Sequence, residues 1–136
     1  MASPALDQLP HTIDSLPYGV ISYPAQPEPR CAVAIGSHAL DLSEYAKTDV
    51  LKDVLPSADS IFSEVSLNTF AALPWDQRKA VRSKIQDDLK NGRVASSCLV
   101  PLTEVKNHLP MRIGGYSDFY TSLEHVSRRW KLLDGD

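Results

Sequence analysis

RCAVAIGSHALDL, residues 30–42, is the stretch that decides the fold. Two runs rich in apolar residues, 30–35 and 38–42, flank the pair Gly36-Ser37. A two-residue break of this kind between two strand-like runs is typical of a tight β-hairpin. The hairpin is the clearest β element in the sequence, and the other elements are placed around it.

Two further strands are predicted on either side of the hairpin. Residues 19–23, GVISY, form a short β-branched run that ends at a proline, as strands often do. Prolines at 24, 27 and 29 predict a loop between this run and the hairpin. Residues 97–100 are predicted as the last strand, and residues 103–105 as a single helical turn. The first 17 residues are proline-rich and predict an irregular arm.

Two helices are predicted in the middle of the chain. Residues 67–73 indicate a short helix capped by Ser66 or Asn68. A longer one follows, with Pro74 at its first helical position and a glycine stop at Asn91-Gly92.

The longer helix is amphipathic. Val81, Ile85 and Leu89 share one face at intervals of four residues, and charged side chains occupy most of the rest. Packing of this stripe on the strands predicts a mainly β fold with α, either a small β-barrel or a curled sheet with a helix against it.

Composition excludes several classes of protein. The chain has 136 residues, enough for one domain with a modest core, and a formal net charge of −3. It has no basic stripe to neutralise phosphates, so no nucleic-acid partner is predicted. It has no apolar run near the roughly 18 residues of a transmembrane helix, so no membrane partner is predicted.

Targeting and cysteine usage indicate a cytoplasmic protein. The start of the chain has neither the basic nor the apolar region of a secretory signal. Cys31 and Cys98 form no CxxC spacing and no disulfide framework, so both are predicted to be free thiols.

Chemistry-bearing side chains gather near the end of the chain, in MRIGGYSDFYTSLEH, residues 111–125. Asp118 suits a hard cation such as Mg²⁺ or Ca²⁺, Tyr116 and Tyr120 suit a substrate oxyanion or carboxylate, and His125 suits general-base work. The residue types alone leave another interpretation open. Asp118 would then cap a helix over residues 119–130, with Tyr120 as a packing aromatic and His125 on the helix surface.

The chain resembles the fumarylacetoacetase family. The family motif I-G-D-Y-x-D-F-Y, with a histidine five residues beyond it, is similar to IGGYSDFY at 113–120 and His125. Four upstream segments resemble family motifs in the same order: LPYGV at 16–20, AIG at 34–36, LDLS at 40–43 and LNTF at 67–70. The resemblance therefore extends from about Leu16 to His125.

The resemblance implies a fold and a reaction. It implies an SH3-like N-terminal barrel over residues 1–110 and a truncated start of the catalytic domain, with a helical tail, over residues 111–136. The family reaction is metal-dependent hydrolysis of a carbon–carbon bond in fumarylacetoacetate, which gives fumarate and acetoacetate in tyrosine breakdown. By resemblance Asp118 is a ligand of Mg²⁺ or Ca²⁺, Tyr120 contacts the substrate, and His125 is the general base.

The sequence also departs from the family. Gly115 stands where the motif has Asp, and VSRRWKLLDGD replaces the family's A-x-N-V-G-x-x-F-R after His125. The glutamates and second aspartate that complete the family's metal site are not in this sequence. Because Mg²⁺ or Ca²⁺ takes about six or more oxygen ligands, this chain alone is expected to bind no metal and to lack the family's hydrolysis.

Three functions stay open at this point. The chain is either a fumarylacetoacetase-like protein whose activity needs a homo-oligomer or a partner catalytic domain, a repurposed metal-independent enzyme or binder, or a non-catalytic interaction module. In the second case Tyr120 and His125 would handle a β-dicarbonyl or polyketide-like small molecule.

Overall fold

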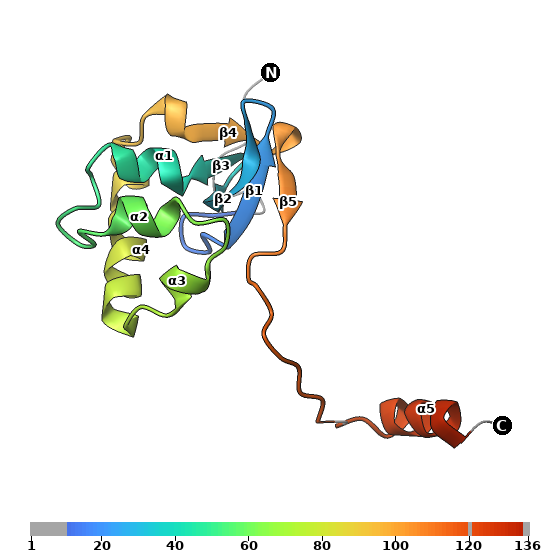
Figure 1. Cartoon of the computed structure of the whole chain (residues 1–136). Coiled ribbons are helices and arrows are strands. Elements are labelled where there is room, and N and C mark those ends of the chain that lie inside the picture. Colours follow the sequence, from blue (N-terminus) through green and yellow to red (C-terminus); the bar gives the residue numbers. More distant parts are fainter. Residues whose placement is uncertain (1–10, 120, 135–136) are drawn as a thin grey trace.

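The computed structural model describes residues 11–119 and 121–134, and their centre is an antiparallel sheet with helices packed on it (Figure 1). The strands are β1 (Tyr18–Tyr23), β2 (Gln26–Ile35), β3 (His38–Asp41), β4 (Leu99–Pro101) and β5 (Lys106–His108). Their order across the sheet is β4-β3-β2-β1-β5. The two short strands that come last in sequence therefore form its two edges.

The predicted hairpin is confirmed. Ile35 pairs with His38 across the Gly36-Ser37 turn, and Gly36 takes a φ of 57° that L side chains rarely adopt. β3, which is the second strand of this hairpin, ends one residue earlier than predicted. Asp41 is its last residue, and Leu42 already begins a helix.

The predicted proline loop before the hairpin is wrong. β2 begins at Gln26 and contains both Pro27 and Pro29. β3 pairs only with residues 32–35, so the two prolines lie where β2 has a free edge on that side. Strands tolerate proline at such an edge because no ladder hydrogen bond is lost there.

The region around β4 and β5 matches the predictions only in part. β4 starts two residues later than predicted, after the 3₁₀ turn η2 (Ser96–Cys98). The single helical turn predicted at residues 103–105 is present as the 3₁₀ turn η3 (Leu102–Glu104). β5 was not predicted, because its three residues KNH carry no apolar pattern. It is held by its ladder with β1 and by a 2.8 Å hydrogen bond between Ser22 Oγ and His108 Nε2.

The expected SH3-like barrel is not confirmed. No ladder joins β4 to β5 in the part of the chain that the structure describes, so the five-stranded sheet is open. The structure has the other predicted form, a small curled antiparallel sheet with helices against it.

Both faces of the sheet are buried, and this explains the continuous apolar run that opened the sequence. Val33 and Leu40 point into the large core under the helices. Ala32 and Ala39 point into a smaller cluster on the opposite face, where Leu102 and Val105 of the η3 segment partly cover them. Alternate residues thus enter different cores, as the two-residue period of a strand requires.

The helices cover the face of the sheet that holds the large core (Figure 1). These helices are α1 (Leu42–Lys47), α2 (Ala58–Phe62), α3 (Asn68–Ala71) and α4 (Trp75–Lys90). The helix α5 (Leu123–Asp134) lies apart from the sheet. The described residues contain no helix long and apolar enough to span a bilayer.

The predicted helices are largely confirmed. α4 buries Val81 and Ile85 and partly buries Leu89, and Gly92 follows it with a φ of 63°. α3 is present, but no side chain caps it, so the predicted capping by Ser66 or Asn68 is wrong. α1 and α2 were not predicted.

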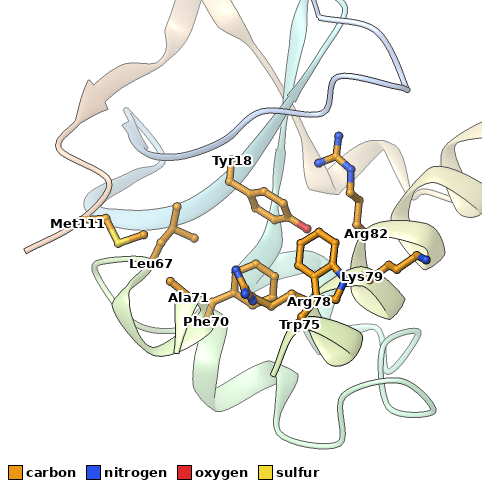
Figure 2. A pocket seen from close by; sticks show the side chains of 9 residues that line it. All are labelled: Tyr18, Leu67, Phe70, Ala71, Trp75, Arg78, Lys79, Arg82 and Met111. Atoms are coloured by element: carbon orange, nitrogen blue, oxygen red, sulfur yellow. The ribbon is translucent and has the colours of Figure 1, made fainter. Parts of the chain in front are cut away.

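Aromatic packing joins α3 to the sheet. The Phe70 ring lies 5.1 Å from the Tyr18 ring of β1 and 5.1 Å from the Phe62 ring of α2, centroid to centroid. Figure 2 shows Tyr18 and Phe70 facing the start of α4, where Trp75 lies. These tilted contacts stabilise the corner of the domain at which β1, α3 and α4 meet.

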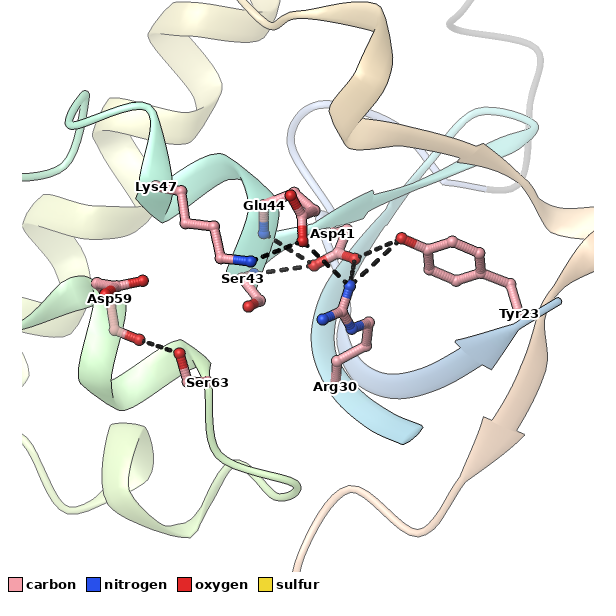
Figure 3. A network of polar contacts seen from close by, with 8 residues as sticks. All are labelled: Tyr23, Arg30, Asp41, Ser43, Glu44, Lys47, Asp59 and Ser63. Carbon is pink, nitrogen blue, oxygen red and sulfur yellow. Dashed lines mark hydrogen bonds and ion pairs between the residues drawn. The ribbon is translucent and has the colours of Figure 1, made fainter. Parts of the chain in front are cut away.

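A buried carboxylate fixes the passage from β3 into α1 (Figure 3). Asp41 is fully buried, and its Oδ1 accepts the backbone N–H groups of Ser43 and Glu44 at 2.9 and 3.1 Å, which caps the helix. Its Oδ2 accepts Arg30 Nη1 at 2.7 Å and the Tyr23 hydroxyl at 2.8 Å. One side chain thus joins β1, β2 and α1.

A second buried carboxylate ties α4 to α1. Asp88 is 1% exposed, and it accepts the Tyr45 hydroxyl of α1 at 2.5 Å, Lys84 Nζ at 2.7 Å and Arg93 Nε at 2.8 Å. Burial acts to raise the pKa of Asp88, but the three hydrogen bonds outweigh it and the pKa lies below its usual value. Asp88 had been placed on the polar side of this helix by the sequence pattern.

We expect Asp88→Asn to lower the free energy of unfolding by about 2–3 kcal/mol at pH 7, because it weakens three hydrogen bonds to a buried charge. Asp87→Asn is the matched control. Asp87 pairs with the same Arg93 but is exposed, so the loss should stay below about 1 kcal/mol. Urea unfolding of both variants measures the difference, and equal losses would contradict the role given to Asp88.

The same pair of variants predicts a pH dependence. Because folding lowers the pKa of Asp88 from 3.8, its contribution is present above that pH and is lost as the pH falls through the folded value. The stability gap between wild type and Asp88→Asn should therefore narrow as the pH falls below 3.8. A gap that stays constant in urea titrations over this range would contradict the lowered pKa.

Candidate functional site

The candidate site lies in the segment that follows the last strand. After Pro110 the backbone runs out from the sheet and leads to α5 (Figure 1). Three hydrogen bonds anchor its start to the domain: the Leu67 N–H donates to the Pro110 carbonyl at 2.8 Å, and the Asn68 side chain forms two bonds with the backbone of Arg112. The residues beyond this anchor are mostly exposed.

Two of the sequence-predicted site residues lie together. Asp118 Oδ2 is 3.5 Å from His125 Nε2, and the same oxygen accepts the Tyr116 hydroxyl at 2.9 Å. The Asp118 side chain is 18% exposed and that of His125 is 53% exposed. Tyr120, the predicted substrate contact, lies outside the described residues.

The start of α5 explains how the pair forms. The helix begins at Leu123, and Ser122 Oγ accepts the His125 backbone N–H at 3.2 Å in the manner of an N-cap. The alternative in which Asp118 caps a helix over 119–130 is therefore wrong. With Ser122 as the cap, His125 sits in the first turn, on the side toward Asp118.

One face of α5 adds positive charge beside the histidine. His125, Arg128 and Arg129 line a shallow hollow of about 450 Å³, together with Ser122, Glu124 and Leu132. Guanidinium groups bind carboxylates well because their N–H fork matches the two oxygens. In the sequence, Arg128 and Arg129 stand in the stretch after His125 that departs from the family pattern.

The described donor set does not fit a divalent metal. Residues 11–119 and 121–134 contain no group of three or more His, Cys, Asp or Glu side chains placed to hold a metal ion. Asp118 offers one carboxylate, and that carboxylate is already engaged by Tyr116 and His125. Mg²⁺ and Ca²⁺ take about six oxygen ligands, and the Asp118 carboxylate alone supplies at most two of them.

The site lies in an unusually apolar exposed segment. Of the large hydrophobic side chains that are exposed in the described part of the chain, most fall between residues 109 and 132. They are Leu109, Met111, Ile113, Tyr116, Phe119, Leu123, Trp130 and Leu132. A concentration of this kind is typical of a surface that another protein surface covers.

Comparison with known proteins assigns the chain to a family. Residues 14–110 match the family model described as "Fumarylacetoacetase N-terminal". The chain belongs to the fumarylacetoacetase family. The family resemblance found in the sequence motifs is therefore confirmed.

The fumarylacetoacetase relatives are much longer than this chain. That of Aspergillus fumigatus is 36% identical over an alignment covering 93% of this chain and 32% of the relative. Those of Rattus norvegicus and Caenorhabditis elegans are 33% and 36% identical, over 91% and 85% of this chain and 31% and 29% of the relative. The chain spans about a third of the length of these fumarylacetoacetases.

We expect this fumarylacetoacetase-family chain alone to bind Mg²⁺ or Ca²⁺ no more tightly than about 1 mM, because a single carboxylate cannot replace the hydration shell of either ion. Isothermal titration calorimetry with each ion measures this, with Asp118→Asn as the comparison. Saturable binding at micromolar concentration that disappears in Asp118→Asn would contradict the expectation.

Proposed function

We propose that this chain serves as the N-terminal module of a fumarylacetoacetase-type hydrolase and contributes Asp118, Tyr120 and His125 to a site completed by a catalytic domain. The proposal is carried by the Asp118–His125 pair, at 3.5 Å in an exposed apolar segment. Membership of the family supports the reaction class. The remaining groups of the site would come from the catalytic domain, in a partner chain or in a homo-oligomer.

The chemistry follows from the residues present. Hydrolysis of the carbon–carbon bond in fumarylacetoacetate needs a base to take a proton from the water that attacks a carbonyl carbon. His125 is the base in this proposal, and the Asp118 carboxylate stabilises the imidazolium that forms. Tyr120 contacts the substrate. The carbon–carbon bond then breaks with its electron pair on the acetoacetate carbon, which takes up the proton held by the His125 imidazolium, and the products are fumarate and acetoacetate.

Docking supplies what the chain alone lacks. An exposed Asp–His pair contributes little, because water screens the attraction between its charges. Covering the apolar side chains of residues 109–132 would remove water from the pair and strengthen the attraction between its two charges.

A cytoplasmic location agrees with the two cysteines, which are both free and buried.

The first test is association. Size-exclusion chromatography with light scattering is run on the chain alone and on its mixture with the separately produced catalytic domain of the Aspergillus fumigatus fumarylacetoacetase. We expect a complex with that domain, or a stable oligomer of the chain alone. A chain that remains monomeric in both samples would refute the docking proposal.

The second test is turnover of fumarylacetoacetate by the assembled sample. We expect His125→Ala to lower kcat by about 10²–10⁴-fold, the range for loss of a general base, without weakening the complex. Glu124→Gln, one residue away on α5, is the matched control and should keep the activity. Equal rates for wild type and His125→Ala would remove His125 from the mechanism.

A second candidate function is favoured by the basic face of α5. His125, Arg128 and Arg129 line one hollow, and such a face suits a β-dicarbonyl or polyketide-like carboxylate without a metal. The chain alone would then turn over or bind such compounds, and His125→Ala would abolish the effect. Absence of any such activity in the chain alone would reject this candidate and leave the docking proposal untouched.

A further inference from the structure

A separate pocket lies on the domain itself, away from Asp118 and His125. It has a volume of about 360 Å³ and is enclosed by the start of β1, α3 and the first half of α4 (Figure 2). The side chains that line it are Tyr18, Leu67, Phe70, Ala71, Trp75, Arg78, Lys79, Arg82 and Met111. Its size falls in the range of small-molecule sites.

Aromatic rings form two sides of the pocket wall. Tyr18 and Phe70 form one side, with their ring centroids 5.1 Å apart. Trp75 stands on the α4 side and is 70% exposed, although indole rings usually bury most of their surface. Two aromatic surfaces with an open volume between them suit a flat apolar group.

A polar group without a partner is present in this aromatic wall. The Tyr18 hydroxyl is buried and has no hydrogen-bond partner among the described residues. In Figure 2 it points toward the side of the pocket where Trp75 and Arg82 lie. Burial raises the pKa of Tyr18 to about 12, although Arg82 acts in the opposite direction, so at neutral pH the hydroxyl keeps its proton and can donate.

Three cations surround the same opening. Arg78, Lys79 and Arg82 form no ion pair with any carboxylate in the described part of the chain. Further along the same helix, Lys84 is paired with Asp88. The first half of α4 therefore presents positive charge that the domain does not neutralise.

Two of these cations are held in position. Arg82 donates to the backbone carbonyls of Asp14, Ser15 and Leu16 at 2.6–3.1 Å. Arg78 donates from Nε to the Leu73 carbonyl at 3.1 Å, and its guanidinium lies 5.5 Å from the Trp75 ring centroid. Ordered cations of this kind bind an anion at a low cost in side-chain entropy.

We propose that this pocket binds a small aromatic carboxylate. The ring lies between Tyr18 and Phe70 on one side and Trp75 on the other, and the carboxylate accepts the Tyr18 hydroxyl and faces the cations. A neutral apolar ligand would leave the charges uncompensated, and a bare phosphate would leave the aromatic wall empty. The basic helix α5 of a second copy is disfavoured by its like charge.

The probe for this proposal is 3-phenylpropionate, with 3-phenylpropionamide as its neutral counterpart. The chain has two tryptophans, so Trp130→Phe leaves Trp75 as its only tryptophan, which is excited at wavelengths that tyrosine does not absorb. We expect saturable change of Trp75 fluorescence with the carboxylate and at least about tenfold weaker binding of the amide. No saturable change, or equal binding of the two compounds, would overturn the proposal.

Two substitutions in the Trp130→Phe background locate the carboxylate. Tyr18→Phe keeps the ring and removes only the unpartnered hydroxyl, so the melting temperature should not fall while 3-phenylpropionate binds about tenfold more weakly. Lys79→Glu should weaken binding by several fold, whereas Lys90→Glu, on the same helix outside the pocket, should not. Unchanged affinity in Tyr18→Phe, or equal losses for the two lysine variants, would show that the anion does not bind here.

Discussion

The ion pair between Arg30 and Asp41 is the interaction on which the rest of the structure depends. The two residues lie on different strands at the open end of the hairpin, and their side chains meet at 2.7 Å inside the domain. Asp41 also caps α1, so the same carboxylate ends β3, starts the helix and holds the strand next to it. Breaking a buried pair of this kind by removing one partner costs about 3–5 kcal/mol, because the remaining charge stays buried.

The sequence predicted the strands and helices in which apolar residues recur at a regular spacing. It missed those that are held mainly by polar contacts. The hairpin and α4 have clear periods of two and of about 3.6 residues, and both were predicted. β5 and α1 do not. β5 is a polar edge held by backbone pairing with β1, and α1 is a six-residue helix that depends on the Asp41 cap. Asp88 looked like a solvent-facing acid because a periodicity plot cannot show that Tyr45 approaches it from another helix.

The candidate site was predictable only through the family motif. Asp118 and His125 are seven residues apart, and nothing in their chemistry alone distinguishes them from a cap and a surface histidine. The structure adds the Ser122 cap, which sets where α5 begins and so brings the imidazole toward the carboxylate. The aromatic pocket gave no comparable signal, because Tyr18, Phe70 and Trp75 come from three separate elements and meet only after folding.

The domain and the segment beyond it differ in how their polar groups are stabilised. Asp41 and Asp88 are buried among several donors each, so their positions are fixed by the fold itself. Asp118 and His125 are partly exposed, and a pair in that setting contributes at most about 1 kcal/mol. In the docking proposal, a second surface excludes water from the pair, and the exposed apolar side chains of residues 109–132 are where such a surface gains most free energy by binding. The same exclusion of water would, in that proposal, strengthen the electrostatic interaction through which Asp118 activates His125.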